Sequence, residues 1–184
     1  MQRRLICPCI VCILLSAAPG YAQIDYFSAA QSPDHERYLQ QVDNFHTNKV
    51  PDSIRVGRLD VAMADLHYAL ERFPNHPKAL QLVGMVAQMR KQTAVAVSYF
   101  ENALRLFPQH ALTHAQYGLF LTTTGQTDEG IEMLKQSIEI DPTLAASYAG
   151  LAHAYAKKGD MEQAREAARK ARELGFRGQL PAGF

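Results

Sequence analysis

The chain has 184 residues, and its 19 Lys and Arg side chains nearly balance its 18 Asp and Glu side chains. A formal net charge of +1 excludes the strongly basic composition on which non-specific nucleic-acid binding depends. The length suits one domain with a continuous core.

The first 22 residues have the pattern of a secretory signal. Arg3 and Arg4 precede an apolar stretch at residues 5–18, and Gly-Tyr-Ala at residues 20–22 forms a small-x-small cleavage pattern before Gln23. The stretch is shorter than the roughly 20 residues that a membrane-spanning helix needs. We therefore expect a mature chain that begins at Gln23, is secreted across the inner membrane to the periplasm, and has no stable membrane insertion.

Removal of this segment changes the composition. The two arginines are removed with it, so the formal net charge changes from +1 to −1. Cys7, Cys9 and Cys12 leave as well, and none of them follows the apolar stretch, where the lipidated cysteine of a bacterial lipoprotein lies. We expect a mature chain without a thiol, and hence without a disulfide or a cysteine metal site.

Residues 23–56 are predicted to be irregular. Residues 23–33 are polar and small and show no helical period, which indicates a flexible lead-in. A helix is then expected from Asp34, whose carboxylate can cap the free amides of the first turn, to Thr47 and Asn48. Pro51 lacks a backbone N–H and restricts Val50, so it forbids one continuous helix through this region.

From residue 57 the sequence repeats at a constant step. Pro74, Pro108 and Pro142 lie 34 residues apart and end helices. Gly125 and Gly159 suit turns with positive φ. A period of this size is typical of stacked helical hairpins. The pattern predicts helices at about 59–73, 77–90, 94–107, 111–124, 127–140, 145–158 and 161–174.

Small residues recur at fixed offsets within this period. In register, the two helices of each predicted hairpin both carry a small residue where their axes must approach, and larger side chains interdigitate around it. The expected pairs are Gly84 with Ala96, Gly118 with Gly130, and Ala152 with Ala164.

These positions resemble those of the tetratricopeptide repeat family. The matching residues are Leu80, Val83, Gly84, Ala96, Phe100, Ala103 and Pro108 in one repeat, Tyr117, Gly118, Gly130, Leu134, Ser137 and Pro142 in the next, and Tyr148, Leu151, Ala152, Tyr155, Ala164 and Ala171 in the last. The resemblance implies an all-α fold, an α-solenoid of antiparallel helix hairpins in a right-handed superhelix. It covers an array at 57–176, with a half repeat at 57–76 and full repeats at 77–110, 111–144 and 145–176, followed by a tail at 177–184. Two departures are the break at Pro51 and Phe176, which stands where the family has Pro.

The resemblance also implies a concave groove, lined by the first helix of each repeat, that binds peptides or partner helices. The Lys, Arg and Asn clamp with which some members grip a chaperone's C-terminal carboxylate is missing here. Carried over residue by residue, the groove positions are Gln81, Met85, Met89, Leu112, Ala115, Leu119, Thr123, His153 and Lys157.

This predicted groove is mostly apolar. An exposed apolar strip marks either a partner site or a surface that the chain covers itself, and methionines suit adaptable contacts with apolar partners. The segments available for self-coverage are the lead-in, through Tyr26 and Phe27, and the tail, through Leu180 and Phe184.

No catalytic, metal or cofactor site is expected. His110 and His114 are four residues apart, but no HExxH pattern or neighbouring carboxylate completes a metal site, and a turn histidine plus a groove-edge histidine accounts for both. The sequence contains no GxSxG elbow and no Gly-rich phosphate loop after a strand. Interleaved charges on the last predicted helix suit a solvated face that ends the stack without a further cap. The alternative is a docking face for an acidic partner or a membrane surface.

The sequence therefore predicts an exported, non-enzymatic scaffold or adaptor. It would bind a partner protein or peptide in the apolar groove and assist the assembly of an envelope complex. The alternative is a self-associating structural module, a homo-oligomer whose groove is filled by its own or a neighbour's terminal segment.

Overall fold

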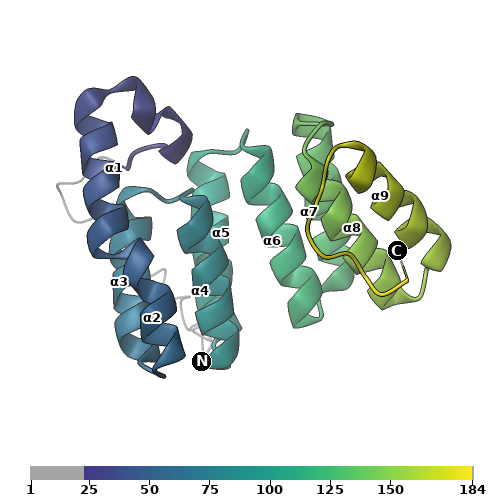
Figure 1. The fold of residues 1–184 in the computed structure, drawn as a ribbon, viewed down its shortest axis with the longest axis horizontal. Helices are drawn as coiled ribbons and strands as arrows, with labels where there is room; N and C mark the ends of the chain where they lie inside the picture. Colours follow the sequence, from purple (N-terminus) through teal and green to yellow (C-terminus); the bar gives the residue numbers. More distant parts are fainter. Residues whose placement is uncertain (1–22, 184) are drawn as a thin grey trace, which may run out of the picture.

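The computed structural model describes residues 23–183, and in this range the chain forms nine α-helices and two short 3₁₀ helices (Figure 1). Successive helices pack as antiparallel pairs along one direction, which is the all-α solenoid expected from the repeat. The predicted signal at residues 1–22 and the last residue, Phe184, lie outside the described residues.

The N-terminal part differs from expectation in two ways. The lead-in expected to be flexible contains the 3₁₀ helix η1 (Tyr26–Gln31), and the N–H of Ile24 donates to the carbonyl of Arg72 (2.8 Å). Helix α1 (Pro33–Phe45) begins after Ser32, so the prediction that Asp34 caps it was wrong. Asp34 lies in the first turn instead, where its charge favours the positive end of the helix dipole.

Pro51 interrupts the helical path as expected. Helix α1 ends at Phe45, the 3₁₀ helix η2 (Thr47–Lys49) follows, and α2 (Val50–Arg55) carries Pro51 in its first turn, where a missing N–H leaves no intrahelical bond unmade. Helix α2 packs on α3, so η2 and α2 together replace the leading helix of the first repeat.

The seven later helices match their predicted spans, and each end lies within one residue of its predicted place. Prolines and glycines therefore determine where these helices stop and start. The helices are α3 (Leu59–Arg72), α4 (Pro77–Met89), α5 (Thr93–Leu106), α6 (Ala111–Thr124), α7 (Thr127–Ile140), α8 (Ala145–Lys158) and α9 (Met161–Glu173).

A left-handed residue recurs once per repeat, after the end of the first helix. The N–H that follows it donates to a carbonyl five residues back, for example from Gln126 to Leu121 (2.9 Å) and from Gln92 to Ala87 (2.8 Å), which is the Schellman pattern of helix ends. Three of the four residues are glycines; the fourth is a lysine in a conformation that L side chains rarely adopt. The residues are Gly57 (φ +75°), Lys91 (φ +57°), Gly125 (φ +101°) and Gly159 (φ +81°).

The small residues close the hairpins, but not all in the predicted way. A Cβ on Gly118 would lie 2.7 Å from the carbonyl oxygen of Gly130, which confirms the close approach of α6 and α7. At Gly84 the three nearest atoms to an added Cβ all belong to the ring of Phe120 on α6, at 3.0 to 3.9 Å, and the pairing of Gly84 with Ala96 stays a prediction. Gly84 makes room for the next hairpin.

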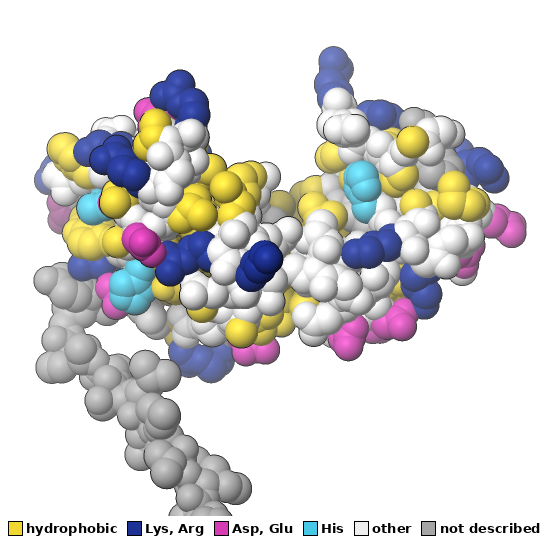
Figure 2. Space-filling model, turned by 90° about the horizontal axis from the view of Figure 1, so that it is seen from below, with side chains coloured by type: hydrophobic (Ala, Val, Ile, Leu, Met, Phe, Trp, Pro, Cys, Tyr) yellow, Lys and Arg dark blue, Asp and Glu magenta, His cyan; other side chains and the backbone are white. Residues whose placement is uncertain are grey.

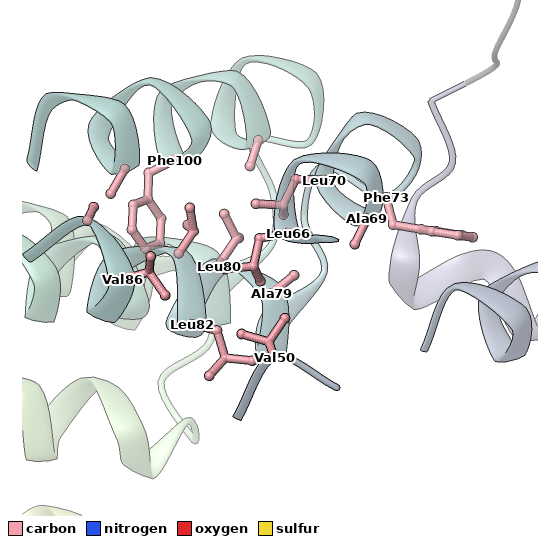
Figure 3. Packing of buried hydrophobic residues seen from close by; sticks show 14 of the residues in the cluster. Val50, Leu66, Ala69, Leu70, Phe73, Ala79, Leu80, Leu82, Val86 and Phe100 are labelled. Carbon is pink, nitrogen blue, oxygen red and sulfur yellow. The ribbon is translucent and has the colours of Figure 1, made fainter. Parts of the chain in front are cut away.

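The interior consists of two clusters that share α6. The first extends from Ala29 to Leu121 and the second from Ala115 to Leu180. Figure 3 shows side chains from α3, α4 and α5 pointing toward one another, among them Phe100, which is 1 % exposed. Burial of a side chain of this size contributes roughly 1.5 to 3 kcal/mol, so the stacked helices depend on these contacts.

The C-terminal tail covers the end of the stack. Nη1 of Arg172 donates to the carbonyls of Phe176 (2.8 Å) and Gly178 (3.1 Å), which turns the chain back along α8 and α9 (Figure 1). Leu180 is 6 % exposed and belongs to the second cluster with Ala168. The expectation that α9 ends the stack without a further cap was therefore wrong.

Candidate partner-binding groove

Three first helices, α4, α6 and α8, place equivalent residues in rows because they occupy the same position in successive repeats. Helices α4 and α6 contact one another, as do α6 and α8. Each row takes one residue from each helix in turn. The rows are Gln81, Ala115 and Ala149; Met85, Leu119 and His153; and Met89, Thr123 and Lys157.

The apolar side chains of these rows are exposed on two of the three helices. Met85 is 46 % exposed, Met89 51 % and Leu119 41 %, whereas Ala115 is only 4 % exposed. Leu112, one turn before Ala115, is half-buried. Figure 2 shows the molecule hollowed between its two halves, with hydrophobic side chains on the wall of the hollow. Partly exposed methionine and leucine side chains are the groups that a bound apolar segment would cover.

Polar contacts fix the three helices relative to one another. Nε2 of Gln88 donates to Oγ1 of Thr123 (3.2 Å), and Nζ of Lys157 donates to the carbonyls at the end of α6, Thr122 and Thr123. At the other end, Nε2 of Gln116 donates to the carbonyl of Pro77 (2.9 Å). The groove is therefore built on connected helices, which holds its side chains in place before a partner arrives. Sequence reasoning missed Gln116, because its repeat equivalents, Leu82 and Gly150, share no chemistry with it.

The tail occupies the groove at the last repeat. Nε2 of His153 donates to the carbonyl of Gln179 (3.2 Å), and Leu180 lies in the same buried cluster as Ala115 and Ala149. The tail thus contacts the groove at His153 on α8 and leaves Met85 and Met89 on α4 exposed.

The lead-in is docked elsewhere. The ring of Tyr26 lies against His76 (4.6 Å between centroids), and the ring of Phe27 stacks on His110 (4.6 Å). Of the two self-covering segments considered, the tail therefore reaches the groove and the lead-in lies against the turns at its edge.

A buried asparagine anchors the lead-in. The N–H of Tyr26 donates to Oδ1 of Asn75 (2.9 Å), and Nδ2 of Asn75 donates to Oδ1 of Asp25 (2.6 Å). Burial raises the pKa of Asp25, but hydrogen bonds from Asn75 and the Phe27 N–H and the charge of His110 outweigh it, so the pKa lies below its usual value.

His76 lies beneath the lead-in and is 2 % exposed. Its Nδ1 accepts from the N–H of Ala79 (3.3 Å), so its Nε2 carries the proton that it donates to Asp43 (2.8 Å). Burial lowers the pKa of His76, because loss of hydration disfavours the charged ring more than Asp43 favours it.

His110 and His114, which are four residues apart in the sequence, have different partners. Nε2 of His110 faces Oδ1 of Asp25 (3.1 Å), whereas His114 is buried and donates from Nε2 to the carbonyl of Pro108 (2.8 Å). The expectation of a groove-edge position for His114 was therefore wrong. Among residues 23–183 no group of three or more His, Cys, Asp and Glu side chains has the arrangement of a metal site.

Residues 121–175 match the family model described as the tetratricopeptide repeat. No curated protein matches the chain. No helix between residues 23 and 183 combines the length and apolarity needed to cross a membrane.

Solved structures with the same fold include MamA, residues 41 to the end, from Desulfovibrio magneticus RS-1. It shares 23 % identity with this chain, and the match covers 77 % of this chain and 84 % of that one with a TM-score of 0.51. A second is YrrB, described as a TPR protein with an unusual peptide-binding site, at 22 % identity and a TM-score of 0.52, covering 68 % of this chain and 65 % of that one. Identities of this size show a shared fold.

Proposed function

We propose that the chain is an exported, periplasmic adaptor without enzymatic activity that binds a partner peptide or helix in the groove of α4, α6 and α8. The observation that carries the proposal is the exposure of Met85, Met89 and Leu119 on equivalent faces of adjoining helices. Uncovered apolar side chains in a hollow are costly in water unless a partner covers them. The signal-like pattern at residues 1–22 supports export, and assembly of an envelope complex is the proposed role in a bacterium with two membranes.

A partner pull-down with paired variants tests the groove. Met85→Glu with Leu119→Glu places two charges on the floor, and it should abolish recovery of cross-linked partner proteins from envelope extracts. The matched control is Val61→Glu with Val95→Glu, on α3 and α5, because these valines are 45 % and 37 % exposed and, like Met85 and Leu119, are equivalent positions of successive repeats. Equal recovery by the groove variant and the wild type would refute the groove assignment.

The alternative is a self-associating module in which a neighbour's tail enters the groove. The buried position of Leu180 and the contact of Gln179 with His153 favour it, because an exchanged tail could make the same contacts between two chains. Light scattering over a hundredfold range of protein concentration decides it. A monomer at every concentration eliminates this function and leaves the partner-binding one.

A further inference from the structure

Acidic residues are segregated between the two kinds of helix. In the seven helices from α3 to α9, every Asp and Glu lies on α3, α5, α7 or α9, the second helices of the hairpins. The groove helices α4, α6 and α8 carry no carboxylate, and lysines lie on α4 and α8. The groove therefore has an apolar floor with positive charge at its ends, although the chain as a whole is nearly neutral.

Two of these lysines, Lys78 and Lys157, have only neutral partners. Nζ of Lys78 donates to Oδ1 of Asn48 (2.6 Å), and Nζ of Lys157 donates to the carbonyls of Thr122 and Thr123. Among the described residues neither has a carboxylate within 4.0 Å. These two charges are therefore free to attract a carboxylate from a partner.

Three cations near the groove are paired with carboxylates. Arg90 contacts Asp60 (2.5 Å), Lys158 contacts Asp128, and Lys135 on α7 contacts Glu132 (3.1 Å). In the N-terminal part of the chain, Asp43 is paired with His76 and Asp52 is paired with Arg55. Lys78 and Lys157 thus differ from these three cations, because their partners are neutral.

We propose that the occupant of the groove is an acidic amphipathic segment of a partner protein, with apolar side chains on Met85, Met89 and Leu119 and carboxylates beside Lys78 and Lys157. This inference rests on the proposed function and specifies the chemistry of its partner. Lys78 lies near the start of α4 and Lys157 near the end of α8, so the two charges mark opposite corners of the floor.

The position of the lysines sets the length of the segment. Eleven positions of the repeat separate them along the helix axes, about 17 Å at 1.5 Å per residue. Two neighbouring interhelical spacings add roughly 18 Å across the floor. The diagonal is on the order of 25 Å, which a helix of about 16 residues spans.

A peptide selection tests the inference. Random peptides of about 16 residues, the length that spans the diagonal, are displayed on phage and selected against the purified protein, and binders lost on Met85→Glu with Leu119→Glu are kept as groove binders. These should contain more Asp and Glu than Lys and Arg. Their affinity in 20 mM NaCl should fall about tenfold in Lys78→Gln with Lys157→Gln, where glutamine retains a donor for the same oxygens, and the loss should shrink in 500 mM NaCl because salt screens exposed charges.

Lys135→Gln is the matched control, since this lysine lies on α7 and is already paired with Glu132. It should leave peptide affinity unchanged. Groove binders without an acidic excess, or a loss that persists in 500 mM NaCl, would overturn the acidic partner while leaving the groove in place. A selection that yields no groove-dependent binder would count against the proposed function itself.

Discussion

Gly118→Ala should destabilise the protein, although alanine favours a helix more than glycine does. The added Cβ would lie 2.7 Å from the carbonyl oxygen of Gly130, 2.7 Å from Cγ of Leu134 and 3.1 Å from the N of Leu134. Two of these atoms are backbone, so α6 and α7 must move apart. Overpacking of this kind costs about 1 to 3 kcal/mol, and the upper part of the range applies because backbone cannot rotate away. The higher helix propensity of alanine offsets about 1 kcal/mol of this cost, so the free energy of unfolding should fall by about 2 kcal/mol.

Gly84→Ala is the matched control, because Gly84 has the same repeat position on α4 and receives the same substitution. Its Cβ would meet Cδ2 of Phe120 at 3.0 Å and Cε2 at 3.5 Å, and an aromatic ring can tilt. Packing loss and helix gain should then nearly cancel, within about 1 kcal/mol.

Urea unfolding followed by circular dichroism measures both variants. The expected loss for Gly118→Ala corresponds to a melting temperature lower by about 4 to 8 °C for a chain of this length. A Gly118→Ala variant as stable as Gly84→Ala would refute the close approach of α6 and α7 as the reason for this glycine.

Two further stability predictions use single positions. Lys91→Gly should stabilise the protein by about 0.5 to 1 kcal/mol in urea unfolding, because it removes a side chain from the left-handed region at φ +57°; an unchanged urea midpoint would contradict this reasoning. The lowered pKa of His76 means that the unfolded chain binds more protons below about pH 6.5, so the unfolding free energy should fall from there toward pH 5. His76→Asn retains an acceptor for the Ala79 N–H and should flatten this profile between pH 5 and 7; a variant with the wild-type slope would show that another group is responsible.

The seven helices from α3 to α9 could be predicted because their ends depend on local chemistry. Proline ends or begins a helix whatever surrounds it, and Gly125 and Gly159 adopt the positive φ that a Schellman turn needs. Lys91 shows the limit of this reasoning. It occupies the same turn as those glycines, and only its place in the repeat, not its residue type, indicates its conformation.

The two terminal segments could not be predicted, because their contacts are made over long sequence distances. The lead-in is held by the side chain of Asn75, about 50 residues away, and an asparagine between two prolines reads as an ordinary turn residue. Nothing in a window around Tyr26 contains the partner that orders it. Local periodicity predicts which residues share a helix face, but it does not predict segments that are ordered by residues distant in the sequence.

The size of the residues along the stack explains why the tail docks where it does. Phe100, Leu134 and Ala168 are equivalent in successive repeats, and the ring of Phe100 packs on Tyr117 and Phe120 of the following helix. Within residues 23–183 no helix follows α9 to pack on Ala168, whose side chain is much smaller, and Leu180 joins Ala168 in the second cluster. Filling that space brings Gln179 against His153, so the tail that covers the end of the core also contacts the groove on α8. The carried-over apolar positions that remain exposed, Met85, Met89 and Leu119, accordingly lie on α4 and α6.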